Sequence, residues 1–188
     1  KRWMTLWRWF AWPLNCSYTF CMYNKPISAI VLGAGMRGAD AYAPYALAHP
    51  DQLDIVGVAE PVEVRRHRFA AAHDIDPANS FETWQAVFDR PKFADVVINT
   101  TQDQMHFAST VAALEAGYDV LLEKPITNSL VETVQLVQLA EQNGRLLQIC
   151  HVLRYTNFFT KLHEIVTSGR LGDIITVEHR EKIGRAHV

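Results

Sequence analysis

The sequence has little cysteine, no large basic block, and no internal repeat or low-complexity segment. Its three cysteines, Cys16, Cys21 and Cys150, lack the spacing of a metal site or a disulfide framework. The net charge of −2 argues against nucleic acid as the main partner. Cys150 lies in an apolar run, as a small core residue of a protein in a reducing compartment does. We therefore expect a cytoplasmic protein without a metal site.

The composition is that of a chain with a packed core. Hydrophobic residues make up 49% of the 188 residues and charged residues 20%, which is typical of a globular chain rather than a disordered one. The length allows one large domain, or one domain and part of another.

Residues 1–22 differ from everything that follows. Four of the five tryptophans lie there, at Trp3, Trp7, Trp9 and Trp12. The stretch is interpreted either as translated upstream sequence, non-native or disordered, with Met22 as the natural start, or as a signal peptide or membrane anchor. Arg8 and Pro13 interrupt the apolar run and no small-x-small cleavage site follows, which favours the first interpretation and predicts no membrane association.

The last residues are also unusual. The hexapeptide IGRAHV at 183–188 resembles the translation of a common sequencing-adapter oligonucleotide. We expect that the natural reading frame was cut near Lys182 and that the chain is an N-terminal fragment.

The stretch at residues 29–38, AIVLGAGMRG, carries the first chemical signal. An apolar run followed by Gly33-x-Gly35-x-x-Gly38 predicts a buried strand, a tight turn and the first turn of a helix, an arrangement that points backbone N–H groups at a phosphate. Gly33 permits the turn, Gly35 lets a pyrophosphate approach the backbone, and Gly38 lets helix and strand pack closely. Alone, the pattern also fits a plain strand-to-helix turn.

A second buried strand, at residues 53–59, ends at Glu60. An acidic residue about 20 residues past the last glycine is placed to hold the ribose hydroxyls of NAD, the alternative being a surface glutamate at a strand end. Arg65, Arg66 and Arg68 follow on the next helix. Such a run is usually a solvated face, but one arginine near Glu60 could meet a 2′-phosphate, so NADP stays open.

Helices and strands alternate along the rest of the first 150 residues. We expect helices over residues 36–48 (kinked at Pro44), from Pro61 to about 73, around 84–88, and after the capping-box patterns Thr101-x-x-Gln104 and Ser129-x-x-Glu132, and strands at 80–81, 94–99, 118–122 and 146–150. Gly117 and Gly144 are expected to close the last two helices.

The predicted strands are near-continuous apolar runs, which is typical of a parallel sheet covered on both faces. The predicted fold is therefore α/β, a Rossmann-type doubly wound parallel sheet. Ligands bind beyond the carboxyl ends of such strands, and Gly33, Glu60, Thr100 and Lys124 all lie at such ends. Together with the glycine motif, these residues predict a dinucleotide-binding site.

The pattern changes from Arg154. An amphipathic helix is expected from the spacing of Phe158, Phe159, Leu162, Ile165 and Val166. Gly169 ends it, Gly172 makes a turn, and alternating residues at 174–179 predict a strand. We expect two domains, a nucleotide-binding one at 23–151 and the truncated start of an α+β substrate domain at 152–188.

These residues give the chain a resemblance to the Gfo/Idh/MocA oxidoreductases over about 25–182. The glycine turn GAGMRG, the segment NTTQDQMHFASTVAALEAGYDVLLEKPIT with Glu123-Lys124-Pro125, the sequence VLRY and the turn GRLGDI all fit. Thr101 departs from the pattern, since the family often has proline there, and this leaves the cofactor interpretation intact.

The resemblance implies NAD or NADP as hydride carrier, with NAD favoured, and a sugar, polyol or related hydroxy compound as substrate. The predicted cofactor-binding residues are Gly33, Gly35, Met36, Arg37, Gly38, Glu60, Thr100, His106, Glu123 and Lys124. His106 is expected to pack or cap near the cofactor rather than to act as an acid or base. The implied substrate-side candidates are Arg154, Tyr155, Glu178 and His179, each of which also suits a structural role.

Lys124 is carried over as the catalytic lysine. An ammonium at a strand end near the nicotinamide can bond the reacting oxygen and stabilise negative charge there. The alternative is a surface lysine paired with Glu123.

Two other functions stay open at this stage. One is a glycosidase of the same fold that uses bound NAD transiently, and the other is a non-catalytic nucleotide-binding protein. Members of the family commonly use the second-domain sheet for oligomer contacts, so a full-length homo-oligomer is expected.

Overall fold

The computed structural model describes residues 25–180. The expectations for residues 1–22 and 183–188 lie outside this range. Within it, no helix is both long and apolar enough to span a bilayer. The chain divides into two compact units, Lys1–Ile98 and Asn99–Val188.

The elements alternate as the sequence predicts. In chain order they are β1 (Ile27–Leu32), the π-helix η2 (Met36–Tyr42), α1 (Ala43–Ala48), β2 (Leu53–Ala59), α2 (Glu63–Ala72), η3 (Pro77–Asn79), β3 (Ser80–Phe81), α3 (Trp84–Phe88), β4 (Val96–Asn99), η4 (Asp103–Met105), α4 (His106–Glu115), β5 (Asp119–Leu122), α5 (Leu130–Gln142), β6 (Leu147–Ile149), η5 (Val152–Tyr155) and α6 (Asn157–Thr167).

The strands form one six-stranded sheet in the order β3-β2-β1-β4-β5-β6. The pairs β1–β2, β2–β3 and β5–β6 are parallel. This order is the one that defines the doubly wound Rossmann fold, so the predicted fold class is confirmed.

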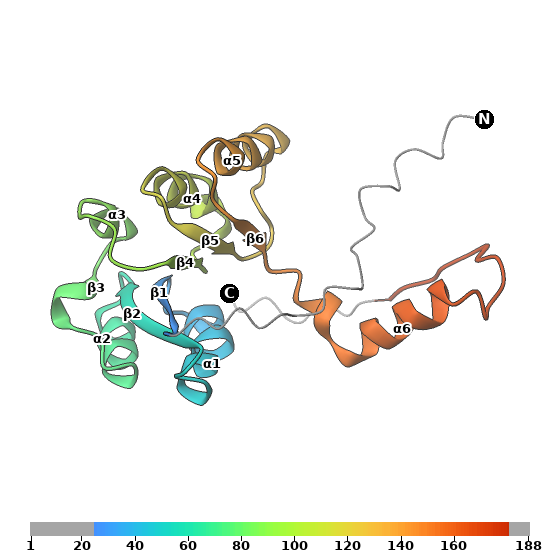
Figure 1. Cartoon of the computed structure of the whole chain (residues 1–188), viewed down its shortest axis with the longest axis horizontal. Helices are drawn as coiled ribbons and strands as arrows, with labels where there is room; N and C mark the ends of the chain where they lie inside the picture. Colours follow the sequence, from blue (N-terminus) through green and yellow to red (C-terminus); the bar gives the residue numbers. More distant parts are fainter. Residues whose placement is uncertain (1–24, 181–188) are drawn as a thin grey trace. The chain divides into compact units, whose positions relative to one another are not determined.

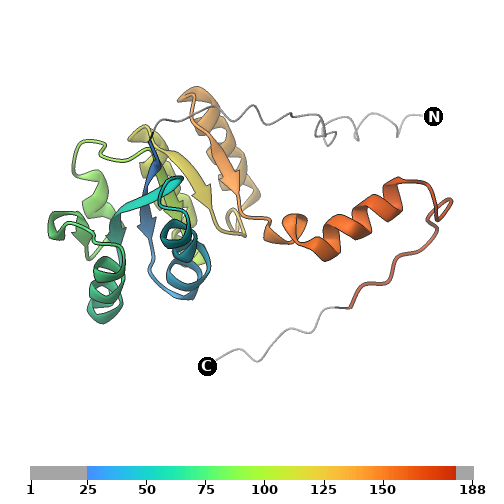
Figure 2. The same ribbon diagram turned by 60° about the horizontal axis from the view of Figure 1, so that its bottom comes forward.

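In the first unit, β1 and β2 run side by side with α1 and α2 packed against β2 (Figure 2). Ile30 and Leu32 of β1 and Ile55 and Val58 of β2 are fully buried. Burial of successive residues in one strand means that both sheet faces are covered, which is why these strands have no polar alternation.

In the second unit, α4 packs against both β5 and α5 (Figure 1). Its core contains Leu114, Tyr118, Leu122 and Leu136, all nearly inaccessible to solvent. Gly117 follows the end of α4 with a φ of 82°, which only glycine adopts readily, and the Tyr118 N–H then donates to the Ala113 carbonyl. This closure is the predicted one.

The first helical segment covers the predicted range in two forms. Residues 36–42 are π-helical and α1 begins at Ala43, with Pro44 in its first turn. Near Pro44, where a kink is predicted, the π-helix ends and the α-helix begins. Proline fits the first turn of the α-helix because the N–H groups of a first turn need no partner inside the helix.

Two predicted helix starts are wrong. α2 begins at Glu63, not at Pro61, because the Glu60 carboxylate accepts the Val62 N–H (3.0 Å) and holds this segment outside the helix. Thr101 does not cap α4, since its hydroxyl donates to Asn99 Oδ1 (2.8 Å) and a short 3-10 turn precedes the helix.

The Ser129 cap is confirmed in part. Ser129 Oγ accepts the Glu132 N–H (3.4 Å) at the start of α5. The Ser129 N–H, which the Glu132 side chain would accept in a full capping box, donates instead to Thr127 Oγ1 (3.1 Å).

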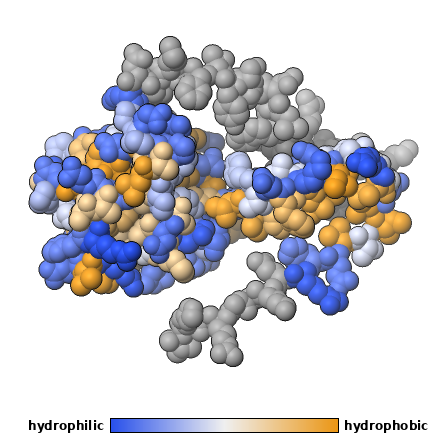
Figure 3. All heavy atoms as spheres, turned by 90° about the horizontal axis from the view of Figure 1, so that it is seen from below, coloured by the Kyte–Doolittle hydropathy of each residue, from blue (hydrophilic) through white to orange (hydrophobic). Residues whose placement is uncertain are grey.

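The strand predicted at 174–179 is also wrong. In the part of the chain that the structure describes, this segment pairs with no strand. α6 forms close to its predicted range but has no buried residue, and Figure 3 shows apolar side chains along it. Alternation favours a strand only where a neighbouring strand supplies hydrogen bonds.

Candidate functional site

The glycine turn has the geometry that its sequence predicts. Gly33 has a φ of 90°, and its N–H donates to the Ala59 carbonyl (2.8 Å). Gly35 caps the first helical segment, and a Cβ built on it meets no atom of the described chain within 4 Å. Gly38 is buried. Gly35 therefore presents bare backbone to open space.

Glu60 connects this turn to the end of β2. Its side chain is almost fully buried, with 4% exposed. Oε2 accepts the N–H of Ala34 (2.8 Å), inside the glycine turn, and Oε1 accepts the N–H of Val62 (3.0 Å). An ionised carboxylate offers about four lone-pair sites, so two sites stay available for hydroxyl donors.

One of the three predicted arginines reaches this strand end. Arg66 is half-buried, and its Nη1 donates to the Glu60 carbonyl oxygen (2.6 Å). Arg65 and Arg68 are exposed on α2, as a solvated face predicts. Only Arg66 therefore places positive charge beside the acidic residue.

Met36 and Arg37 lie on the first turn of the helical segment. Met36 is 76% exposed. The Arg37 guanidinium lies 5.8 Å from the centre of the Tyr42 ring, which holds it along the helix surface.

In the second unit, the end of β4 carries a buried polar network. Asn99 is fully buried, and its Nδ2 donates to Ser109 Oγ (2.7 Å) and Thr110 Oγ1 (3.0 Å). Its Oδ1 accepts the Thr101 hydroxyl (2.8 Å). Thr100, between these groups, is half-buried. Burial of an amide is tolerated because these bonds use both ends of it.

His106 lies at the start of α4 and is 1% exposed. Its Nδ1 lies 2.7 Å from the Pro125 carbonyl oxygen and its Nε2 lies 3.1 Å from the Thr101 carbonyl oxygen. With both ring nitrogens turned to backbone oxygens, His106 is packed as predicted, and neither nitrogen is left to exchange a proton with a ligand.

Lys124 follows β5 directly and its side chain is exposed. Glu123 is buried, and its Oε2 accepts the Lys124 N–H (2.8 Å). The Glu123 N–H in turn donates to the Asn99 carbonyl (3.0 Å). The Lys124–Pro125 peptide bond is cis. The loop thus combines a hydrogen-bonded backbone with an exposed ammonium.

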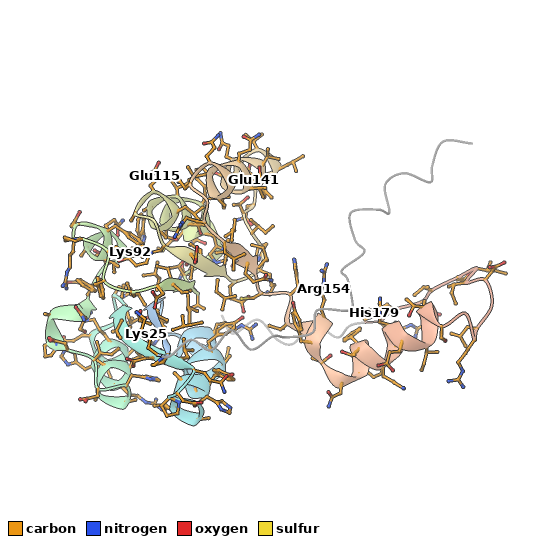
Figure 4. All side chains as sticks on the ribbon, in the orientation of Figure 1. Lys25, Lys92, Glu115, Glu141, Arg154 and His179 are labelled. Carbon is orange, nitrogen blue, oxygen red and sulfur yellow. The ribbon has the colours of Figure 1, made fainter. Side chains whose placement is uncertain are left out.

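The substrate-side candidates lie elsewhere in the second unit. Figure 4 shows Arg154 on η5 and His179 in the extended segment beside α6. Tyr155 is exposed, Glu178 pairs with Arg180 (2.6 Å), and His179 stacks on Phe159 at 6.5 Å between ring centres. Arg154 is also exposed.

Sequence reasoning missed the contributions of Asn99 and of the Pro125 carbonyl. For Asn99 a signal exists, since it is a polar residue that ends the apolar strand at 94–98. The carbonyl has no signal in sequence, because every residue has one.

The residues present at the glycine turn fit a dinucleotide. Bare backbone at Gly35 leaves room for a pyrophosphate, and the carboxylate of Glu60 suits ribose hydroxyls. Among the described residues, no group of three or more side chains suits a metal ion.

Comparison with known proteins supports this assignment. A family model described as "Oxidoreductase family, NAD-binding Rossmann fold" matches residues 27–151. The scyllo-inositol 2-dehydrogenase (NADP(+)) of Bacillus subtilis is 28% identical over 149 residues, which are 79% of this chain and 39% of that protein. An inositol 2-dehydrogenase of Salmonella typhimurium is 27% identical over 155 residues, or 82% of this chain and 45% of that protein.

Solved structures show the same fold. The WlbA dehydrogenase of Chromobacterium violaceum, in complex with NADH and UDP-GlcNAcA, has a TM-score of 0.73 at 18% identity. The match covers 80% of this chain and 42% of the WlbA chain. Aldose-aldose oxidoreductase of Caulobacter crescentus, complexed with glycerol, has a TM-score of 0.69 at 22% identity. The match covers 79% of this chain and 44% of that protein.

The chain spans less than half the length of these curated relatives. The family match nevertheless includes residues of both compact units and contains the glycine turn, Glu60 and the Glu123-Lys124-Pro125 loop. The chain therefore belongs to the Gfo/Idh/MocA oxidoreductase family and carries its NAD-binding Rossmann domain.

Proposed function

We propose that this chain is the cofactor-binding part of a dehydrogenase that transfers a hydride between NAD(P) and a CH–OH carbon of a sugar, polyol or related compound. The observation that carries the proposal is Lys124. It is an exposed ammonium directly after a buried strand, with its backbone bonded to Glu123, inside a family-wide NAD-binding domain.

The chain's own residues have two tasks in this proposal. The glycine turn and Glu60 bind the pyrophosphate and ribose of the cofactor. In the reduction, Lys124 Nζ as an ammonium donates a hydrogen bond to the reacting oxygen, stabilises negative charge on it and gives it a proton. In the oxidation, Nζ as a neutral amine takes the hydroxyl proton. When bound, the nicotinamide supplies the hydride acceptor or donor.

A sugar-like substrate is supported by the relatives named as inositol dehydrogenases. Residues from 152 onwards begin the substrate domain in this proposal, and the sheet of that domain forms the contacts of a homo-oligomer. Cys150 is buried and forms no disulfide, which agrees with a cytoplasmic location.

NAD is the favoured cofactor because the Glu60 carboxylate repels a 2′-phosphate at the ribose. Arg66 is the residue that would oppose this repulsion, and one relative is named as NADP-dependent. The ratio of NADH to NADPH affinity measures which charge dominates.

The test uses a protein that joins residues 25–180 to a substrate domain. Lys124→Ala is expected to lower turnover about 100-fold to 10,000-fold, with NADH affinity unchanged. Lys161→Ala is the control, because Lys161 is an exposed lysine that pairs with Glu164 on α6. Undiminished turnover of Lys124→Ala would show that the role given to this lysine is wrong.

The two open alternatives give different outcomes in the same assay. Net NADH production from a polyol supports the dehydrogenase, whereas sugar release without net NADH identifies a glycosidase. Cofactor binding without turnover of either kind identifies a nucleotide-binding protein.

A further inference from the structure

His106 makes two contacts with the backbone of its own unit. Its Nδ1 lies 2.7 Å from the Pro125 carbonyl oxygen, and its Nε2 lies 3.1 Å from the Thr101 carbonyl oxygen. A carbonyl oxygen only accepts, so a ring nitrogen forms a hydrogen bond with it only where that nitrogen carries a proton. A neutral imidazole donates through one nitrogen and an imidazolium through both. The shorter of the two contacts is the one to Pro125.

The position of the ring is set from the helix side. Ser109 Oγ donates to the Met105 carbonyl (2.8 Å), one residue before His106. The same hydroxyl oxygen accepts a hydrogen from Asn99 Nδ2 (2.7 Å), and Asn99 is fully buried at the end of β4. The start of α4 is therefore tied to the strand end through the Ser109 hydroxyl, by one buried and one partly buried bond.

The contact with Pro125 completes the fixation of Lys124. On the N-terminal side, the Lys124 N–H donates to Glu123 Oε2 (2.8 Å) and the Glu123 N–H donates to the Asn99 carbonyl (3.0 Å). On the C-terminal side, His106 binds the carbonyl of the next residue. Lys124 and Pro125 thus lie between two anchored peptide groups.

We propose that His106 is a positioning residue for Lys124, acting through the hydrogen bond from its Nδ1 to the Pro125 carbonyl. This inference rests on the proposed role of Lys124 in turnover. A misplacement of about 1 Å in a reacting group lowers a rate about 100-fold, so a bond that fixes the lysine's backbone affects turnover more than cofactor affinity.

Two substitutions separate the two ring nitrogens. The amide nitrogen of asparagine is two bonds from Cβ, like Nδ1, whereas that of glutamine is three bonds from Cβ, like Nε2. His106→Asn therefore keeps a donor for Pro125, and His106→Gln keeps a donor for Thr101.

We expect kcat of His106→Asn to stay within about threefold of the unchanged enzyme, and kcat of His106→Gln to fall about 10-fold to 100-fold. Substrate KM and NADH affinity are expected to change less than about threefold in both variants. Thermal melting of both variants checks that the difference in kcat is not a difference in folded fraction.

A second readout needs no turnover. The backbone amide nitrogen of Ile126 belongs to the same peptide group as the Pro125 carbonyl, so its NMR shift reports the bond from His106. We expect His106→Asn to keep the Ile126 shift of the unchanged chain and His106→Gln to move it.

Equal kcat losses in the two variants, at equal folded fraction, or an Ile126 shift that His106→Gln leaves unmoved, would overturn the positioning role. Full turnover in Lys124→Ala overturns the proposed function instead. The two failures are therefore distinguishable.

Discussion

The loops after β2 and after β5 are held by different chemistry. After β2, the Glu60 carboxylate accepts two backbone N–H groups, those of Ala34 and Val62. After β5, His106 turns its ring nitrogens to backbone carbonyl oxygens, while the Glu123 carboxylate accepts the N–H of Lys124. One loop is organised around an anion and the other around a buried polar network.

The difference matches what each loop has to present. Backbone N–H groups and bare glycine serve an anionic ligand, so an acidic anchor at the side fixes the turn without filling it. An ammonium that acts on a reacting oxygen needs a fixed backbone and an exposed side chain, which the network around Lys124 provides. The following substitutions test the bonds that hold these two loops and their neighbouring elements.

The largest effect on folding is expected at Asn99, which holds the second loop. Asn99→Ala removes two donors, to the buried hydroxyls of Ser109 and Thr110, and the acceptor of half-buried Thr101, which should lower the free energy of unfolding by about 3 kcal/mol. Urea unfolding measures this loss, and Asn128→Ala, at an exposed position, is the control. A loss no larger than that of the control contradicts the network.

Glu60→Gln tests the first loop. Glutamine accepts one of the two N–H groups and faces the other with a donor, so NADH affinity should fall about tenfold. Affinity for NADPH should fall less, because the charge that repels its 2′-phosphate is gone. Titration calorimetry measures both, with Glu63→Gln on exposed α2 as control. Equal losses for the two cofactors contradict the charge argument.

Ser129→Ala tests the cap behind the Lys124 loop. Its Oγ accepts the Glu132 N–H at the start of α5, so removal should lower the free energy of unfolding by about 1 kcal/mol. Ser168→Ala is the matched control, since Ser168 follows the C-terminal end of α6 and its Oγ donates to the Ile165 carbonyl (2.7 Å) instead of accepting an N–H of that helix. Thermal unfolding compares the two, and indistinguishable midpoints count against the cap.

Asp95 gives the smallest effect, one that depends on pH. The Ser28 hydroxyl (2.6 Å) and N–H (2.9 Å) hold the pKa of Asp95 below its usual range. A lowered native pKa adds stability that is present above the unfolded-state pKa of about 3.9 and is lost as pH falls through the native pKa.

Asp95→Asn should therefore cost less than about 1 kcal/mol near neutral pH, since the group is partly solvated, and should flatten the acid side of the stability profile. Urea unfolding across acidic pH measures the slope. Asp51→Asn, at an exposed position, is expected to leave it unchanged. An unchanged slope in Asp95→Asn contradicts the role of the Ser28 bonds.

Sequence patterns predicted the fold because its determinants are local. β2 and α3 have the predicted bounds, and the sheet order follows from apolar strands alternating with helices. The errors arise where a side chain two residues away competes for a group at the start of a helix. That side chain is held in place by a more distant bond of its own, from the Ala34 N–H to Glu60 and from Asn99 to Ser109. Glu60 takes the Val62 N–H that helix geometry would leave free, and Asn99 takes the Thr101 hydroxyl that a capping box requires.

For the candidate site, the sequence likewise indicated which residues lie near one another, but not all of their contacts. The glycines and Glu60 come together in the first unit, and His106 meets the Lys124 loop in the second. The proximity of these residues can be predicted, because they lie at strand ends and in motifs of known spacing. The contact from His106 to a carbonyl oxygen cannot be predicted in this way, because it depends on the path of the chain after Pro125.

The two hydrogen bonds that the Glu60 carboxylate accepts, from the Ala34 and Val62 N–H groups, have a consequence for the rate at which a ligand binds. Because Ala34 is already bonded to the carboxylate, the turn takes its shape during folding, and an incoming anion orders no loop residue on arrival. Preorganisation of this kind reduces the entropic cost of association. Encounter, rather than rearrangement of the turn, then sets the association rate at this strand end.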